Sequence, residues 1–431
     1  MCTEFFGDTK KNLNKEQDMS AGRILSFLLL LFFFQLVIGC APAAQKTSTV
    51  MPGVDVLLAE KLDLIKGKRV GLITNPTGVT ATLQSTIDVL HRQPDVRLVA
   101  LFGPEHGVRG DVEAGKRVAS YTDEKTGVPV YSLYGKTRKP TSEMLREVDV
   151  LIYDIQDIGS RAYTYIYTLA LAMQSAKEKD IPFIVLDRPN PLGGDLVEGP
   201  VLDVRFKSFI GMYPIPYIYG MTVGELARLF NEEFDIHCNL TVVPMRGWRR
   251  SMAFSNTGLE WVPTSPHVPH AKTAFFVAAV GCIGELHSVN EGVGYTLPFE
   301  LIGAPWIDAD DLARELNSRR LPGVHFRPVH YRPYYFSFQG QQLQGVQIHL
   351  LDAKTFRPMR IQIHILTALK KLYPGQNIFN TDRIQSFYRA IGTDKVQKAI
   401  EAGKNADEII AEWQPELQAF MKIRQKYLIY E

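Results

Sequence analysis

The first half of the chain alternates between short apolar runs and segments with a helical spacing of apolar residues. Short apolar runs that stop at turn residues are typical of buried parallel strands. We expect such strands at residues 70–74, 97–102, 128–131, 148–154, 181–186 and 240–244. The helices between them are expected at residues 82–92, 140–147, 161–180 and 222–234, the last of them beginning with a capping box of Thr222 and Glu225. This alternation predicts an α/β fold with a mostly parallel, Rossmann-like sheet.

The alternation stops after about residue 250. Residues 252–270 are rich in Pro, Ser and Thr and are expected to be irregular. Beyond them the pattern predicts helices at residues 309–319, 359–373, 388–402 and 406–427, and strands at 324–338 and 345–351. We therefore expect a Rossmann-like catalytic domain over residues 53–250, followed by a smaller α+β auxiliary domain over residues 251–431.

The amino terminus has the pattern of an export signal. Residues 24–38 are almost entirely apolar, follow Arg23, and are too few for a comfortable membrane span. The sequence then reaches Gly39-Cys40, which resembles the bacterial lipoprotein signal, where the Cys is lipidated. That resemblance implies a signal peptide over residues 1–40, a tether over 41–52, and a lipid anchor at Cys40. It also implies that the protein is located in the cell envelope. An anchor in the outer membrane, with the protein facing the periplasm, is favoured. The alternative is a buried amino-terminal hydrophobic helix.

The composition argues against several classes of protein. The 431 residues carry a net charge of +2 and no Lys/Arg-rich block, so no nucleic-acid partner is expected. Only Cys238 and Cys282 lie outside the leader, and no Cys-x-x-Cys occurs, so neither a disulfide framework nor a zinc ribbon is expected. The chain has no dinucleotide fingerprint, Walker loop or Gly-x-Ser-x-Gly elbow, and we expect no cofactor.

Polar side chains follow four of the predicted strands. The carboxyl ends of parallel strands lie at one edge of a sheet, where α/β proteins bind ligands. We therefore expect a polar cleft built from Asn75, from Glu105, His106, Arg109 and Asp111, from Asp154, Gln156, Asp157 and Arg161, and from Asp187, Arg188 and Asn190.

Two carboxyl groups at such an edge fit glycoside hydrolysis. Glu105 is the expected general acid, because Phe102 and Pro104 would shield it and raise its pKa. Asp154 or Asp157 would supply the second carboxylate. The alternative for Asp157 is stabilisation of a helix amino terminus capped by Ser160.

The remaining candidates would bind substrate, and each has a structural alternative. Arg161 and Arg188 could hold a carboxylate through the planar guanidinium, or could form internal ion pairs. Tyr163 could stack on a sugar, whereas core packing is favoured for Tyr165. His106 could hold Glu105 or a sugar hydroxyl, or could have only a structural role.

Glu291 and Tyr295 stand among glycines in residues 289–300, which form either a binding loop or a simple hairpin. A metal site of His106, Asp111 and Asp154 is conceivable, but no ligand spacing supports it and no metal is expected.

Several motifs are long and nearly contiguous. They lie at residues 71–78, 102–110 (Phe-Gly-Pro-Glu-His-Gly-Val-Arg-Gly), 153–165, 187–194, 198–200, 264–269 and 292–300. From about residue 53 to the end, the chain resembles the exo-β-N-acetylmuramidases, a family of peptidoglycan-recycling glycoside hydrolases formerly called a domain of unknown function.

The resemblance implies a cleft between a Rossmann-like and an auxiliary domain. It implies release of β-1,4-linked N-acetylmuramic acid from the non-reducing end of muropeptides or of N-acetylmuramyl-N-acetylglucosamine disaccharides. It also implies that Glu105 is catalytic. The lactyl carboxylate of such a substrate would give Arg109, Arg161 or Arg188 a partner.

Two other hypotheses are a non-catalytic lipoprotein that binds muropeptides and a metal-dependent envelope hydrolase. The acetamido group of the substrate could also take part in place of a second carboxylate.

Overall fold

The computed structural model describes residues 50–105, 107–110, 120–135 and 137–431. The described residues from Val50 to the carboxyl terminus belong to one compact unit. The predicted signal peptide and lipidated Cys40 lie outside the described residues and stay predictions. Among the residues that are described, no helix has the length and apolar character needed to cross a membrane.

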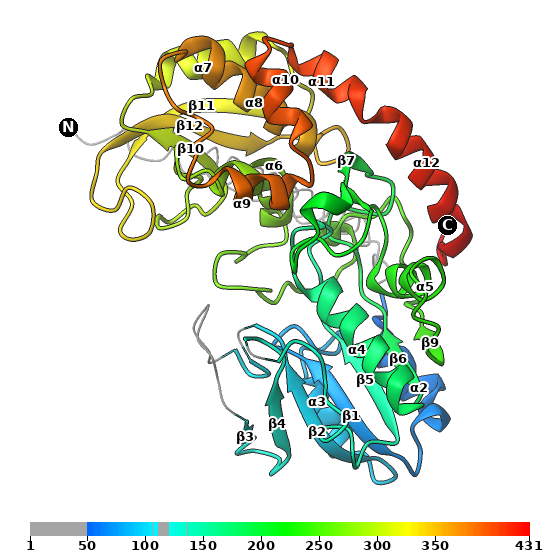
Figure 1. The fold of residues 1–431 in the computed structure, drawn as a ribbon. Coiled ribbons are helices and arrows are strands. Elements are labelled where there is room, and N and C mark those ends of the chain that lie inside the picture. The colour runs from blue at the N-terminus through cyan, green and yellow to red at the C-terminus, as the bar shows by residue number, and fades with distance from the viewer. Residues whose placement is uncertain (1–49, 106, 111–119, 136) are drawn as a thin grey trace, which may run out of the picture. The chain divides into compact units, whose positions relative to one another are not determined.

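The first half of this unit is built on one seven-stranded sheet (Figure 1). Its order is β3-β4-β2-β1-β5-β6-β9, and only the short edge strand β3 runs antiparallel to its neighbour. The strands are β1 (Arg69–Thr74), β2 (Arg97–Gly103), β3 (Tyr121–Thr122), β4 (Pro129–Ser132), β5 (Val150–Asp154), β6 (Phe183–Leu186) and β9 (Leu240–Val243).

The order of the six parallel strands is that of a Rossmann fold. Numbered along the chain, they lie in the order 3-2-1-4-5-6, which reverses between β1 and β5. In the register of the sheet, Ile73 pairs with both Phe102 and Tyr153, so β1, β2 and β5 end at the same level. The predicted fold class is confirmed, and the polar residues that follow these strands share one edge.

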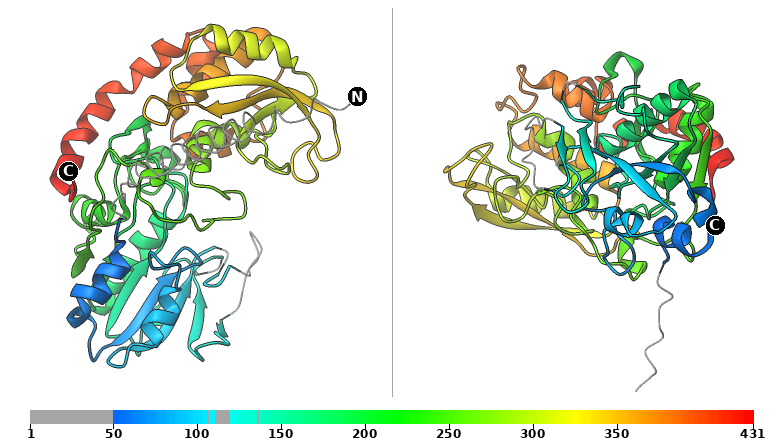
Figure 2. Two further views of the ribbon diagram at one scale, coloured as in Figure 1. Left: turned by 180° about the vertical axis from the view of Figure 1, so that it is seen from behind. Right: turned by 90° about the horizontal axis from the view of Figure 1, so that it is seen from below.

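Helices cover both faces of this sheet (Figures 1 and 2). Their bounds are α2 (Gly53–Glu60), α3 (Thr86–His91), α4 (Tyr165–Lys179) and α5 (Val223–Glu233). Because successive side chains of a strand point to opposite faces, Leu72 packs in the core with α2 and α3, whereas Ile73 packs with α4 and α5.

Two of the predicted helices begin later than expected. Helix α3 starts at Thr86, and Leu83 instead has a φ of 63° and an exposed side chain. Helix α4 starts at Tyr165, because Ser160 pairs with Ile218 and the Arg161 backbone donates to Tyr217. The prediction that Ser160 caps this helix is therefore wrong.

The segment 140–147 forms turns rather than the predicted helix. The backbone N–H of Leu145 reaches Thr141, but that of Arg146 reaches only three residues back, to Glu143. In contrast, the capping box predicted between Thr222 and Glu225 is present at the start of α5. The capping residues therefore predicted this helix end correctly. The helix predicted from the sequence pattern at residues 140–147 does not form.

The second half holds a three-stranded antiparallel sheet with helices on it. Its order is β10-β12-β11, and α7 packs on β11 and β12 while α8 packs against α6 and α7. A two-stranded sheet, β7 (Glu198–Val201) with β8 (Pro216–Ile218), lies between β6 and α5 in sequence. The remaining strands and helices are β10 (Leu301–Ala304), β11 (Val324–Tyr331), β12 (Leu343–Leu350), α6 (Thr273–Gly284), α7 (Ala309–Ser318), α8 (Pro358–Leu372), α9 (Ile384–Ile391), α10 (Lys395–Glu401), α11 (Ala406–Glu412) and α12 (Gln414–Arg424).

The two long terminal helices of the prediction are each interrupted. Gly392 ends α9 with a φ of 86°, a conformation that favours glycine, and α10 begins only at Lys395. Trp413 separates α11 from α12.

Helix α6 has no predicted counterpart, because its sequence is apolar on all sides and shows no helical period. The predicted domain boundary at residue 250 stays a prediction.

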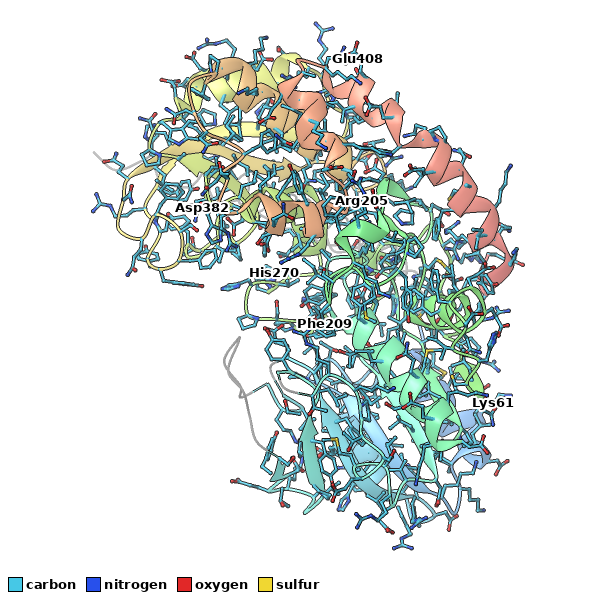
Figure 3. All side chains as sticks on the ribbon, viewed as in Figure 1. Lys61, Arg205, Phe209, His270, Asp382 and Glu408 are labelled. Atoms are coloured by element: carbon cyan, nitrogen blue, oxygen red, sulfur yellow. The ribbon has the colours of Figure 1, made fainter. Side chains whose placement is uncertain are left out.

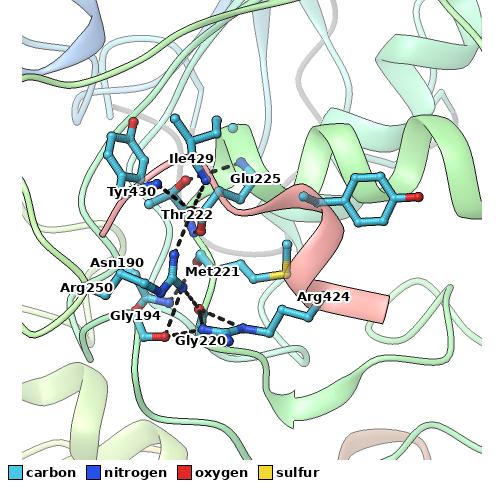
Figure 4. A network of polar contacts seen from close by, with 12 residues as sticks. Asn190, Gly194, Gly220, Met221, Thr222, Glu225, Arg250, Arg424, Ile429 and Tyr430 are labelled. Carbon is cyan, nitrogen blue, oxygen red and sulfur yellow. Dashed lines mark hydrogen bonds and ion pairs between the residues drawn. The ribbon is translucent and has the colours of Figure 1, made fainter. Parts of the chain in front are cut away.

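The carboxyl terminus returns to the first half of the chain (Figure 4). Helix α12 ends at Arg424, whose guanidinium donates to the carbonyls of Gly194 and Gly220. Arg250 donates to the same two carbonyls and forms a buried ion pair with Glu225, with Nη1 2.7 Å from Oε1. Glu225 also accepts a hydrogen bond from the backbone of Ile429. This network fastens the last residues to α5.

Replacing Arg250 with Met tests how far the fold depends on this network. Removing one partner of a buried ion pair typically costs about 3–5 kcal/mol, because the other charge stays buried and unpaired. We expect Arg250→Met to lower the free energy of unfolding by that amount in urea titrations. The control is Arg246→Met, which breaks a more exposed pair with Glu60 and should cost less than about 1 kcal/mol. Equal losses in the two variants would contradict the role given to the network.

Candidate active site

A narrow crevice lies at the switch point of the sheet, beyond the ends of β1 and β5. Thr77, Gln156 and Arg188 line it together with Phe254 and Trp261 from the irregular segment. The turn after β1 is joined to the turn after β5, because the Gln156 backbone donates to the Thr77 hydroxyl at 2.9 Å. The predicted polar edge therefore exists, and residues that follow three different strands meet there.

Asp154 is fully buried and lies in an ion pair with Arg188. Arg188 Nε is 2.6 Å from Oδ1 and Nη2 is 2.9 Å from Oδ2, while the Thr86 hydroxyl donates to Oδ2 at 2.6 Å. Arg188 also donates to the carbonyl of Val79. Both oxygens of Asp154 are thus occupied, and this geometry favours a positioning role over the catalytic role predicted for it.

Asp157 is buried with a different set of partners. Its Oδ2 accepts hydrogen bonds from the Tyr219 hydroxyl and the Gly159 backbone. Its Oδ1 has no partner among the described residues. Burial raises the pKa of Asp157 to about 6. The proposed alternative, stabilisation of a helix start at Ser160, lacks support because α4 begins five residues later.

Glu105 follows β2 and stays partly exposed. Two tyrosines lie beside it. Burial raises the pKa of Tyr134, and the negative charge of Glu105, which accepts a hydrogen bond from it, raises this pKa further. Burial also holds the pKa of Tyr165 well above its usual value, with a smaller contribution from Glu105. An accessible carboxylate next to a phenol is a group that can exchange a proton with a bound substrate.

Arg138 adds a positive charge to this group. It lowers the pKa of Tyr134, against the larger effect of burial, so its positive charge acts on the Tyr134 hydroxyl. The guanidinium carbon is 4.2 Å from the centroid of the Phe209 ring (labelled in Figure 3). Arg138 is exposed. Its position in the sequence does not single it out, because no predicted strand ends next to it.

Tyr163 and Tyr165 are held by the segment 264–265. The Tyr165 hydroxyl donates to the carbonyl of Thr264 at 2.6 Å, and the Tyr163 hydroxyl bonds to the Thr264 hydroxyl at 3.0 Å. The two rings meet edge to face, with centroids 4.9 Å apart. Tyr165 also lies beside Asn75. Core packing of Tyr165 is confirmed, and Tyr163 stays partly exposed.

Two of the arginines that were predicted to bind substrate instead bind other groups of the protein. Arg109 donates to Asp88 at 3.0 Å and to Asp123 at 2.9 Å, and this pairing lowers the pKa of Asp123 to about 2. Arg161 is fully buried and donates to the carbonyls of Pro200, Ile215 and Ala390. Both side chains join distant segments, which favours the structural alternative for each.

The predicted amide side chains are bound to the backbone. Gln156 Nε2 donates to the carbonyl of Pro189 at 2.7 Å, and Asn190 Nδ2 donates to that of Met221 at 2.9 Å. Asn75 Oδ1 accepts from the backbone and hydroxyl of Thr77. These three residues shape the edge of the sheet. The predicted site residues His106 and Asp111 lie outside the described residues.

Glu291 is buried in the second half of the chain. Its Oε2 has no hydrogen-bond partner among the described residues. Burial raises the pKa of Glu291 to about 7, and the negative charge of Glu285 adds to the increase. Gly284 makes room for it, since a Cβ at that position would lie 2.7 Å from the Glu291 carboxyl carbon. A carboxyl group that is half protonated near neutral pH suits proton transfer.

Tyr295 lies in the same loop and packs its ring against Tyr331 and Tyr334. Over the described parts of the chain, no three His, Cys, Asp or Glu side chains are grouped as metal ligands would be.

The comparisons with known proteins bear on this arrangement. Residues 70–272 match the family model described as the N-terminal part of the exo-beta-N-acetylmuramidase NamZ, and residues 278–430 match the C-terminal part. The chain belongs to this family. It is 48% identical to the peptidoglycan beta-N-acetylmuramidase NamZ of Bacillus subtilis (strain 168), over 94% of this chain and 99% of that protein. The chain is therefore an enzyme, a glycoside hydrolase.

Two solved structures share the fold. Both are DUF1343 family proteins from Bacteroides fragilis NCTC 9343. One is 46% identical with a TM-score of 0.84, and the other is 30% identical with a TM-score of 0.72. Each comparison covers 89% of this chain and 99% of the other.

Replacing Glu291 with Gln tests whether this buried carboxyl group takes up a proton near neutral pH. Glu291 has a folded pKa above its unfolded value, so its stabilising contribution is complete below about pH 4.5 and is lost as pH rises through about 7. Compared with Glu291→Gln, the wild type should therefore lose on the order of 2–3 kcal/mol of unfolding free energy over this range. Urea titrations of both proteins at several pH values measure the difference. A difference that is independent of pH would contradict the assigned environment.

Proposed function

We propose that this enzyme releases N-acetylmuramic acid from the non-reducing end of peptidoglycan fragments. The Bacillus subtilis relative, a peptidoglycan beta-N-acetylmuramidase, supports this substrate class. The observation that carries the proposal is the partly exposed Glu105 carboxyl at the end of β2, beside Tyr134 and Tyr165. In this proposal Glu105 donates a proton to the glycosidic oxygen as the bond to the anomeric carbon breaks, and water supplies the new hydroxyl of the released sugar.

Two buried carboxyl groups are the candidates for the second catalytic function. Asp157 and Glu291 have pKa values raised by burial to about 6 and about 7. Each also has one carboxyl oxygen without a partner among the described residues. Asp154 is a weaker candidate, because Arg188 and Thr86 occupy both of its oxygens. Asp157 or Glu291 would stabilise positive charge at the anomeric carbon or orient the acetamido group of the substrate.

Replacing Glu105 with Gln tests the general acid. The amide keeps the size of the side chain but cannot donate the proton, so we expect kcat to fall roughly 10²–10⁴-fold. The assay is chromatography of N-acetylmuramic acid released from N-acetylmuramyl-N-acetylglucosamine. Glu143→Gln, at an exposed position, is the control and should keep full activity. Unchanged turnover by Glu105→Gln would remove Glu105 from the mechanism. Wild-type binding of the disaccharide without release would leave only a sugar-binding role.

Arg138 is the proposed partner of the lactyl carboxylate. Arg109 and Arg161 are bound to other groups, whereas Arg138 is exposed and its charge acts on Tyr134, the tyrosine beside Glu105.

The Arg138→Met variant tests this contact. A hydrogen bond to a charged group contributes about 1.5–3 kcal/mol, so kcat/KM for muramyl substrates should fall roughly 10–100-fold, mainly through KM. Binding of the corresponding N-acetylglucosaminide, which lacks the lactyl group, should not change. Arg146→Met, an exposed arginine nearby in sequence, is the control. Equal losses on the two substrates would show that Arg138 does not recognise the carboxylate.

A further inference from the structure

Three consecutive aromatic side chains are exposed in the loop 332–342, which joins β11 to β12 and is called the aromatic loop below. The exposed fractions are 67% for Tyr334, 49% for Tyr335 and 52% for Phe336. Aromatic residues of this size are usually buried, and a contiguous exposed apolar patch is characteristic of a binding surface. The proposed function assigns no role to this loop.

The backbone of the aromatic loop is held in a strained conformation. Phe336 and Phe338 have φ values of 67° and 61°, a region that bulky residues avoid. Hydrogen bonds close the loop on itself, from the Gly340 backbone to Pro333 and from the Gln339 backbone to Phe336. Such strain persists where the surrounding structure imposes it, and it is concentrated at functional sites.

The glycine-rich segment 290–295 forms the seat of the aromatic loop. The Tyr334 backbone donates to the Gly294 carbonyl at 2.7 Å, and the Tyr334 ring stacks on Tyr295 at 5.8 Å between centroids. Gly294 has a φ of 92°, and a Cβ there would lie 1.9 Å from the carbonyl oxygen of Tyr335. Only glycine permits this approach. The Asn290 side chain, next to Glu291 in sequence, donates to the Ser337 carbonyl, so the loop contacts the segment that carries this candidate catalytic carboxyl.

A second contact joins the aromatic loop to the segment 264–267, which holds the tyrosine beside Glu105. The Tyr335 hydroxyl hydrogen-bonds with Nε2 of His267 at 2.9 Å. His267 follows shortly after Thr264, whose carbonyl accepts the hydrogen bond from Tyr165 beside Glu105. The loop is therefore fastened to segments that reach both candidate catalytic regions, while its rings stay exposed.

We propose that the aromatic loop is a platform for the part of the glycan that lies beyond the cleaved bond. The inference rests on the proposed function. An enzyme that removes one terminal sugar encloses that sugar, and the rest of the chain must extend outward over the surface. Pyranose rings present apolar C–H faces, which pack on the flat faces of Tyr334 and Phe336. The ligand class is therefore a β-1,4-linked N-acetylhexosamine chain of two or more units.

The Tyr334→Ala/Phe336→Ala double variant tests the platform. Both side chains are exposed, so we expect an unchanged melting temperature. For a tetrasaccharide with a terminal N-acetylmuramic acid, kcat/KM should fall about tenfold or more, a factor equivalent to ~1.4 kcal/mol. The inhibition constant of free N-acetylmuramic acid, which fills only the terminal site, should stay the same.

Leu351→Ala serves as the control. It removes an apolar side chain that is 68% exposed at the opposite end of the same hairpin, and it should leave kcat/KM for the tetrasaccharide unchanged. An unchanged kcat/KM in the double variant would contradict the proposed role of the aromatic loop. An equal change in the inhibition constant of N-acetylmuramic acid would also contradict it.

Failure of the proposed function gives a different result. In that case the wild type releases no N-acetylmuramic acid from any substrate. The platform is then tested by calorimetry with the same tetrasaccharide, whose Kd should be about tenfold weaker for the double variant than for the wild type. Equal Kd values would overturn the platform whatever reaction the enzyme catalyses.

Discussion

The buried ion pair between Asp154 and Arg188 is the interaction on which the arrangement of the candidate site depends. It joins the end of β5 to the end of β6, and through Thr86 and Val79 it also holds the start of α3 and the turn after β1. Two buried charges are tolerated here because each oxygen of Asp154 is hydrogen-bonded. The pair fixes the switch point of the sheet, so the turns beyond the strands have one defined geometry.

Charges near the site fall into two groups. The guanidinium groups of Arg109 and Arg161 are occupied by carboxylates or carbonyls and stabilise the fold. Asp157 and Glu291 instead keep one oxygen without a partner among the described residues, and burial shifts their pKa values toward neutrality. Buried and incompletely bonded carboxyl groups lower stability, and such groups are usually retained where they serve a function.

The sequence identified the edge of the sheet that forms the site but did not separate its functional residues from its structural ones. Glu105 and Asp157 both follow predicted strands, as do Arg161 and Asn190, and nothing in a single sequence distinguishes them. Tyr134 and Arg138 were missed because they follow no strand with a conspicuous polar cluster. Tyr219 was missed for the same reason, although it donates to Asp157. Their roles depend on proximity in space, which local pattern does not encode.

The sequence by itself determined the parallel strands, the capping box at Thr222 and the family motifs, because apolar runs and caps act over a few neighbouring residues. The tertiary structure decided which groups each charged side chain is bonded to. Arg161, for example, donates to a carbonyl 229 residues away. It also decided that the glycines around Glu291 seat an aromatic loop from another part of the chain, since such close approach exists only after the chain has folded.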